Sequence, residues 1–161
     1  MKVKQYKKLN NATALKNAHK KCKLWCHKYV RMRDIKWSSN GHYFICIACG
    51  KFFPITLYQD KSIYNGRHLH ASHYFDSEQM ELVRYCLDNV HLGCDRCNRH
   101  LHGNKENYLP NLKLKISEKR FEKLNFHAHT IKKHNIIELE RMTDEFKLRA
   151  QLRAADLQIK I

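Results

Sequence analysis

The sequence has few residues that interrupt helices and no segment that suits a membrane. Its 161 residues include five glycines and two prolines, the two residue types that weaken or end helices. No run approaches the roughly 18 continuous apolar residues that a membrane-spanning helix needs. Residues 1–10 are rich in lysine, but the apolar segment of a secretory signal does not follow them. These absences favour long helices and predict a cytoplasmic protein with no membrane contact.

Acidic residues are scarce relative to basic ones. The chain has 15 Asp and Glu against 31 Lys and Arg, which gives a formal net charge of +16. So basic a chain attracts polyanions, because each phosphate that it contacts releases condensed counterions. Charge selects a class of partner and says nothing about chemistry, since ribosomal and membrane-surface proteins are basic too. Hydrophobic residues make up 43 % of the sequence, which is enough for a packed core.

The pattern of apolar residues predicts one domain, residues 1–161, with three parts. A basic helix is expected at 11–36, because apolar residues recur there at intervals of three or four positions. Residues 42–112 alternate between strand-like segments and turns and form the predicted core. Residues 113–161 are expected to be helical, with a last helix capped near Thr143. The fold class is therefore α+β, with a small core between N- and C-terminal helices.

Cysteines provide the main clue to the chemistry. Four of the seven form two close pairs, Cys46-x2-Cys49 and Cys94-x2-Cys97. Intracellular cysteines are more often thiols or metal ligands than disulfides, and Zn²⁺ prefers a tetrahedron of four thiolates at structural sites. The pattern predicts a structural zinc ion. The alternatives are four buried cysteines that act as small hydrophobic residues and a redox pair, which is disfavoured because no βαβ pattern surrounds either pair.

Histidine and asparagine gather between and just after the cysteine pairs. A phosphodiesterase needs a base that deprotonates water and a divalent cation that neutralises charge on the phosphate. Neutral histidine is a suitable base near pH 7, and an amide oxygen suits Mg²⁺. Residues of these two types in this region include His68, His70, His73, His91, Asn98, His100, His102 and Asn104. The alternative is that they are packed, surface or helix-capping residues.

The order of these motifs resembles that of the HNH nucleases and, more narrowly, of the NinG (Rap) family of phage recombination proteins. Residues 18–34 also resemble the segment that precedes the motifs in that family. The resemblance covers roughly residues 18–125. The motifs that it rests on, besides the two cysteine pairs, are Ala71-Ser72-His73-Tyr74-Phe75, Asn89-Val90-His91, Cys97-Asn98 and Gly103-Asn104.

This resemblance implies a zinc-stapled ββα-metal (HNH, treble-clef-like) core, in which a hairpin holds the base and a helix holds a metal ligand. His73 would be the general base, and Asn89 in the middle of the motif would orient it. Asn98 would bind the catalytic Mg²⁺ or Mn²⁺, as the asparagine after the second cysteine pair does in phage endonuclease VII. His91 is a further candidate ligand for this ion.

One position departs from the pattern. Many relatives have an aspartate before the catalytic histidine as a metal ligand, and this chain has Ser72. The residues that remain candidates for the second ligand are Asp76, Asp88, His91 and His102.

The function implied by the resemblance is a metal-dependent endonuclease that cleaves branched DNA (Holliday junctions, D-loops) during phage-type recombination in the host cytoplasm. One alternative is a non-catalytic zinc module that binds DNA structure, and another is a sequence-specific HNH nuclease. A homodimer would match the two-fold symmetry of a junction. Phe146, Leu148 and Leu152 on the last helix would pack either on the core or on a second copy.

Overall fold

The fold is a mixture of helices and two small sheets, seen in a computed structural model that describes residues 2–55 and 69–158, with side chains from residue 11 onward. The longer helices are α1 (Lys2–Arg33), α3 (Lys105–Ile116), α4 (Glu118–Ala128) and α5 (Ile136–Asp156). Two short helical segments are η1 (Glu81–Val83) and η2 (Arg96–His100). The predicted α+β class is confirmed.

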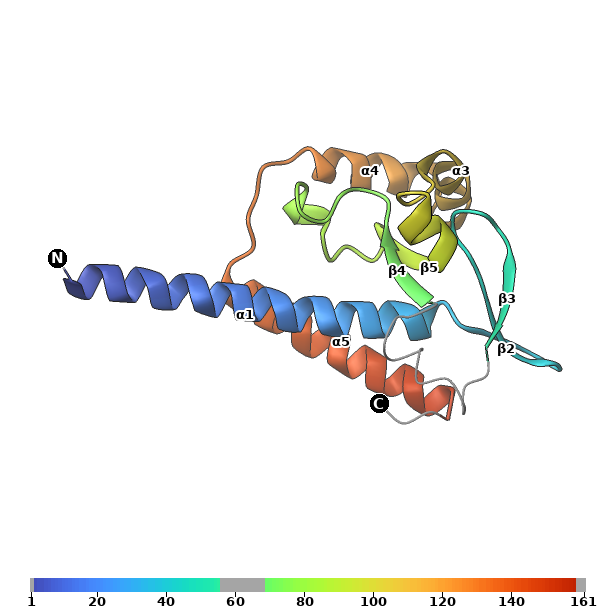
Figure 1. Cartoon of the computed structure of the whole chain (residues 1–161), viewed down its shortest axis with the longest axis horizontal. Coiled ribbons are helices and arrows are strands. Elements are labelled where there is room, and N and C mark those ends of the chain that lie inside the picture. Colours follow the sequence, from blue (N-terminus) through green and yellow to red (C-terminus); the bar gives the residue numbers. More distant parts are fainter. Residues whose placement is uncertain (1, 56–68, 159–161) are drawn as a thin grey trace.

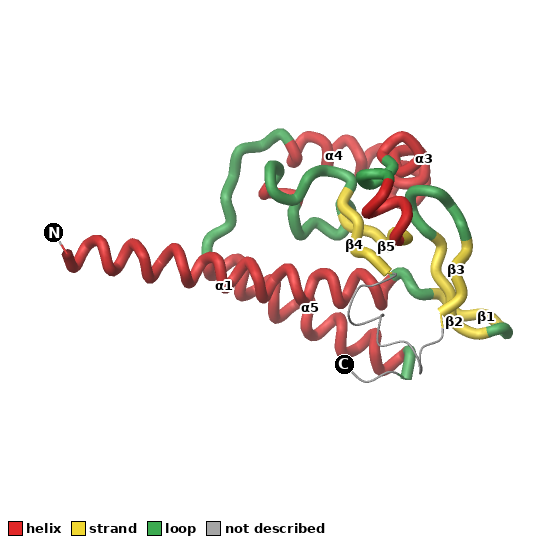
Figure 2. The backbone as a smooth tube through the Cα atoms, viewed as in Figure 1, coloured by secondary structure: helices red, strands yellow, loops and turns green. Residues whose placement is uncertain are grey.

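The sheets are hairpins built from strands that are close in sequence. One sheet has the order β1 (Lys36–Ser38), β2 (Gly41–Ile45), β3 (Phe52–Ile55), and the other pairs β4 (Leu69–His73) with β5 (Val90–Cys94). All of these pairings are antiparallel. Figure 2 shows β4 and β5 between α1 and α5 on one side and α3 and α4 on the other, with β1, β2 and β3 at one edge of the molecule. The turn between β2 and β3 and the end of β5 therefore lie near each other, since the Ile47 amide donates to the Leu92 carbonyl at 2.9 Å. This contact brings the two cysteine pairs together.

Helix α1 is longer at its start and shorter at its end than the sequence predicts. It begins at Lys2 and ends at Arg33, because Lys36 already pairs with Tyr43 in the first sheet. Its first turns project beyond the rest of the molecule, and its second half lies beside α5 (Figure 1). Within residues 2–55 and 69–158, no helix is long and apolar enough to cross a membrane.

A carboxylate at the end of α1 ties that helix to the second hairpin and to α3. Asp34 accepts hydrogen bonds from the Leu92 amide, from the Arg33 guanidinium and from the Lys115 ammonium, each at 2.9 Å. Burial alone would raise the pKa of Asp34, but Arg33 and then Lys115 outweigh it and hold the pKa well below the ordinary value. The contact fixes the relative position of α1 and the site described below.

Helix α5 begins at a different residue from the one predicted. The Asn135 side chain accepts from the Glu138 amide at 2.9 Å, and the Glu138 carboxylate accepts from the Asn135 amide at 3.0 Å, which is a capping box. Thr143 lies inside the helix, where its hydroxyl donates a hydrogen bond to the Leu139 carbonyl. The predicted cap at Thr143 is therefore wrong. Phe146 is buried and stacks on Tyr29 of α1, at 6.4 Å between the ring centroids.

Candidate metal centre and nuclease site

The four predicted zinc ligands come together. The sulfur atoms of Cys46, Cys49, Cys94 and Cys97 all lie within 4.8 Å of one another, and Cys49 Sγ is 4.0 Å from Cys94 Sγ. Sulfurs about 2.3 Å from a tetrahedral zinc ion would be about 3.8 Å apart. The cluster therefore has the size and the ligand type of a structural zinc site, and it could hold that ion.

Nearby backbone and side-chain amide groups donate hydrogen bonds to these sulfurs. Cys46 Sγ accepts from the Cys94 amide at 3.3 Å, and Cys97 Sγ accepts from the Asn104 side chain at 3.5 Å. Gly50 has a positive φ of 67° and closes the first knuckle with its amide on the Cys46 carbonyl. Such donors around thiolates are the outer-shell interactions that orient metal ligands.

The thiols differ in how readily they ionise without a metal. Burial raises the pKa of Cys46 and Cys94. At Cys49, burial is outweighed by hydrogen bonds from the Lys51 amide and the neighbouring thiols, so the pKa is lowered. Because a zinc ion deprotonates its cysteine ligands outright, the buried thiols need a cation to form the thiolate set.

His73 is held in one tautomer at the end of β4. Its Nε2 donates to the carbonyl oxygen of Arg84 at 3.0 Å, which leaves Nδ1 with the lone pair. Burial, followed by the positive charge of Lys23, lowers the pKa of His73, and the Arg84 carbonyl and Asp76 partly oppose the change. The imidazole is therefore neutral at pH 7 and has a nitrogen that can accept a proton.

Asn89 bridges the two ends of the loop that carries Arg84. Its side-chain oxygen accepts from the Phe75 amide at 2.7 Å, and its amide group donates to the carbonyls of Phe75 and Val83 at 3.1 and 3.0 Å. The residue is completely buried. Because Val83 precedes the His73 partner Arg84, Asn89 shapes the segment that orients the histidine.

Ser72 and Asn98 contact each other between the hairpin and η2. The Ser72 hydroxyl donates to Asn98 Oδ1 at 2.8 Å, and the Ser72 carbonyl accepts from the Tyr108 hydroxyl at 3.0 Å. Ser72 is 3 % exposed and lies against Gly93, where a Cβ would stand 2.3 Å from its Oγ. Side chains alternate along a strand, so Ser72 faces η2 and α3 while His73 faces α1.

His91 lies in the interior with both ring nitrogens paired. Nδ1 accepts from Arg33 at 3.0 Å, and Nε2 donates to the Asp88 carbonyl at 3.1 Å. Burial, together with the charges of Lys115 and Arg33, lowers its pKa to about 3. The imidazole has no free lone pair in this arrangement, so its geometry suits a brace between α1 and β5.

The other residues considered as a second metal ligand are dispersed. Asp76 accepts the Glu78 and Gln79 amides and so caps a turn, and Asp88 pairs with Arg120. Within residues 2–55 and 69–158, the cysteine cluster is the one group of three or more Cys, His, Asp or Glu side chains within metal-binding distance. Asn98 and Ser72 are the oxygen donors that the fold brings together, on the face of β4 opposite to the His73 side chain.

The sequence alone did not single out His27. Its ring on α1 lies 5.4 Å from the ring of His73, measured between centroids, and its Nε2 is buried with no hydrogen-bond partner among the described residues. Burial, followed by the neighbouring charges of His73 and Arg31, lowers its pKa to about 3. The helical spacing of lysines around it was visible in the sequence, but its contact with β4 depends on the tertiary fold.

The chain's family follows from its similarity to known proteins. A family model described as bacteriophage lambda NinG protein matches residues 1–157. The chain belongs to the NinG family. This makes it a phage recombination-related protein and confirms the narrower resemblance that the sequence motifs suggested. Searches among curated proteins and among solved structures found no match. The NinG match covers the whole of α1 and α5 as well as the hairpins between them.

Proposed function

We propose that this NinG-family chain is a DNA endonuclease of the HNH type, in which a ββα-metal core is formed by β4, β5 and η2 and is clamped by zinc. The observation that carries the proposal is the state of His73. Its Nε2–H group donates to the Arg84 carbonyl, so Nδ1 keeps the lone pair, and the preceding residue of β4, Ser72, contacts Asn98 from the other face of the strand. This arrangement supports general-base catalysis, which needs a neutral, oriented imidazole.

The zinc ion has a structural role in this proposal. Cys46 and Cys49 come from the β2–β3 turn, whereas Cys94 and Cys97 come from the end of β5 and from η2. One ion at the four sulfurs would hold η2, and hence Asn98, at a set distance from the hairpin. All four sulfurs would be occupied, and a closed site of this kind leaves no open position for substrate.

In the proposed reaction, His73 Nδ1 removes a proton from the attacking water. Asn89 maintains the loop that holds the histidine in its tautomer, and Ser72 orients the oxygen of Asn98 through their hydrogen bond. A Mg²⁺ or Mn²⁺ ion bound at Asn98 would neutralise the charge that develops on the phosphate and the leaving oxygen. We assign His91 to positioning, because both of its nitrogens are already paired.

The protein provides only part of the ligand set for the catalytic ion. Ser72 and Asn98 offer neutral oxygens, and Mg²⁺ is usually held by one or two carboxylates together with substrate phosphates and water. Phosphate oxygens of bound DNA would therefore have to complete the site. The proposal predicts that Mg²⁺ binds weakly to the free protein and more tightly to its DNA complex, which titration calorimetry can measure with and without a junction.

The proposed substrate is branched DNA, and this part rests on membership of a recombination-related family. The high positive charge supports binding to the DNA backbone, which fixes register without reading base sequence. A second copy of the chain would place two sites on a two-fold symmetric junction. Leu148 and Leu152 of α5, 57 % and 60 % exposed, are the residues that a homodimer of this kind would cover.

The second candidate function is a zinc module that binds branched DNA without cutting it. Ser72 favours this alternative, because a hydroxyl replaces the carboxylate that many relatives use as a metal ligand. Under this alternative, Asn89 and His73 would simply stabilise the hairpin.

The deciding experiment compares cleavage of a four-way junction, a D-loop and a linear duplex of the same sequence, with Mg²⁺, with Mn²⁺ and with no added divalent ion. The test variant is His73→Ala, and the matched control is His100→Ala, which removes an imidazole that is 69 % exposed. Metal-dependent cutting of the branched forms that only His73→Ala abolishes is the expected result. Tight binding with no cutting would leave the non-catalytic module, and one cleaved base sequence in every substrate would indicate a sequence-specific nuclease.

A further inference from the structure

Helix α1 has an unusual distribution of charge for a surface helix. Its sequence from Lys2 to Arg33 contains no aspartate or glutamate. Exposed helices commonly pair lysines with acidic residues three or four positions away, whereas like charges at this spacing repel one another. No such pair exists within α1, so the helix offers its ammonium groups to an external anion.

Three of these lysines share one flank of the helix with His27. Lys16, Lys20 and Lys23 follow one another at intervals of four and three residues, and His27 comes four residues later, which is the spacing of one helical face. All three lysines are exposed, and none is in an ion pair among the described residues. We call this set, Lys16, Lys20 and Lys23, the lysine track.

The track leads to the candidate base. His27 at its end packs against His73 at 5.4 Å between ring centroids, and Lys23 lies near enough to lower the pKa of both histidines. On the other side of the hairpin's end, Ser72 contacts Asn98. A chain of phosphates that runs along the track would thus arrive at the strand end where the proposed chemistry takes place.

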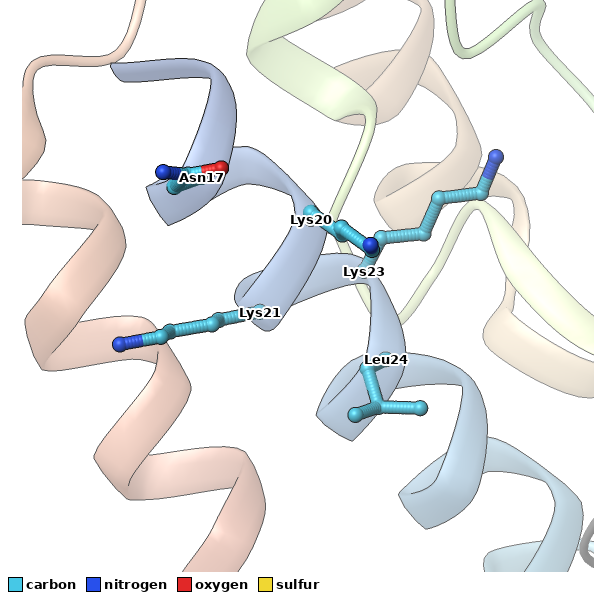
Figure 3. Close-up of a pocket in the computed structure, with 5 residues that line it drawn as sticks. All are labelled: Asn17, Lys20, Lys21, Lys23 and Leu24. Carbon is cyan, nitrogen blue, oxygen red and sulfur yellow. The ribbon is translucent and has the colours of Figure 1, made fainter. Parts of the chain in front are cut away.

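The remaining basic residues of α1 have other positions. Lys21 and Lys23 leave the helix in opposite directions, Lys21 toward α5 and Lys23 away from it, on either side of a hollow that Asn17, Lys20 and Leu24 also line (Figure 3). The ammonium of Lys28 lies over the ring of Trp25, 4.7 Å from its centroid. These neighbours make Lys21 and Lys28 a control pair on the flank that faces α5.

We infer that the lysine track binds the phosphate backbone of one duplex arm and directs that arm to His73. The part of this inference that directs the arm to His73 rests on the proposed function, whereas the binding of phosphates by the track does not. The distance from Lys16 to Lys23 is about 10 Å along the helix at 1.5 Å per residue. This length matches about three phosphates of one strand, which follow at 3.4 Å along the axis of B-DNA. The projecting first turns of α1 (Figure 1) leave room for an arm to extend past the core.

The test measures how DNA binding depends on salt in two double variants of the full-length protein. Lys20→Gln with Lys23→Gln removes two charges from the track, and Lys21→Gln with Lys28→Gln removes two from the opposite flank. Binding of a labelled four-way junction and a labelled duplex is followed by fluorescence anisotropy without Mg²⁺, from low to high salt. Circular dichroism and melting temperature establish that both variants are folded.

In the track variant, the plot of log K against log salt is expected to be less steep. The magnitude of its negative slope should fall by about two, since each lost phosphate contact contributes about 0.9. The control is expected to keep the wild-type slope. Equal salt slopes in the two variants, whether less steep than the wild type or unchanged, would overturn the inference. The effect of a lysine would then not depend on its position on α1. An unchanged slope in the track variant beside a lowered one in the control would overturn it too.

Cleavage separates this inference from the proposed function. His73→Ala is expected to keep the wild-type salt slope, because it removes no backbone contact. If the wild type binds through the track but never cuts, the nuclease proposal fails and the track remains. If His73→Ala abolishes cutting and the track variant binds like the wild type, the nuclease proposal remains and the track fails.

Discussion

The surroundings of His73 determine what this imidazole can do. The Arg84 carbonyl selects the tautomer, while burial and the ammonium group of Lys23 favour the neutral form. The carboxylate of Asp76 raises the pKa of His73, and the ring of His27 packs against the His73 ring. Removing a single charge from this set changes the protonation of His73 without removing the residue itself.

Lys23→Gln is predicted to raise the pKa of His73. A nearby cation disfavours the protonated imidazole, so its removal favours protonation and moves the titration midpoint to higher pH. NMR of the imidazole C–H signals measures this midpoint directly, whether or not the protein cleaves DNA. The acid limb of the cleavage rate should move in the same direction. Lys21→Gln on the opposite flank is the control, and an equal shift in both variants would contradict the assignment.

At the scale of elements, the contact between β4 and η2 depends on a glycine in the neighbouring strand. A Cβ at position 93 would lie 2.3 Å from Ser72 Oγ, closer than real Cβ atoms approach, and 3.1 Å from Ser72 Cβ, which is a tight contact. Gly93 thus allows the Ser72 side chain to lie across β5 and reach Asn98.

Gly93→Ala is predicted to lower the free energy of unfolding by about 1–3 kcal/mol, the usual cost of overpacking. Denaturant titration measures this loss. Adding Ser72→Ala removes the closest clash, so the double variant should be less destabilised than the sum of the single changes. Additive losses would show that the two positions do not compete for the same space.

The start of α5 provides a second prediction at this scale. Asn135→Ala removes one half of the capping box and is expected to cost about 1 kcal/mol of unfolding free energy. Thr143→Ala is the control, because Thr143 lies inside the helix and alanine has the higher helix propensity. A larger loss for Thr143→Ala than for Asn135→Ala in thermal unfolding would place the helix start where the sequence pattern first suggested it.

For the whole molecule, the cysteine cluster joins segments that are far apart in sequence. It links the β2–β3 turn to β5 and η2, while Asp34 links α1 to β5 and α3. The cluster includes Cys94 at the end of β5, and Asp34 binds Leu92 in the middle of the same strand, so β5 connects the zinc cluster to the long helices.

The protein is predicted to contain one zinc ion per chain, and Cys97→Ser is predicted to lose it. Elemental analysis measures the metal content, and thermal unfolding measures the accompanying loss of stability. Chelation of the wild type should lower the melting temperature to a similar extent, since binding of a structural ion contributes directly to folding. Cys86→Ser, outside the cluster, is the control. A stoichiometric zinc content in Cys97→Ser would contradict the four-cysteine site.

Much of the candidate site could be predicted from sequence where the signal is local. The two-residue spacing within each cysteine pair places both sulfurs on one side of a tight turn, and such a pair suits a metal wherever it lies in a fold. The order of Ser72, His73, Asn89 and Asn98 suggested the family for the same reason. The cap of α5 is also a local signal, because Asn135 and Glu138 have the spacing of a capping box.

The charge, the helix content and the chemistry of the cysteine pairs follow from the amino-acid sequence without a structure, because they depend on composition and short spacing. The tertiary structure is needed to establish which histidine is paired on both nitrogens, which serine reaches Asn98 and which lysines lie near His73. Each of these depends on contacts between residues far apart in the chain, such as His91 with Arg33 and His27 with His73. Helical spacing places Lys20 and Lys23 on one face, but only the packing of α1 against β4 directs that face to the candidate base.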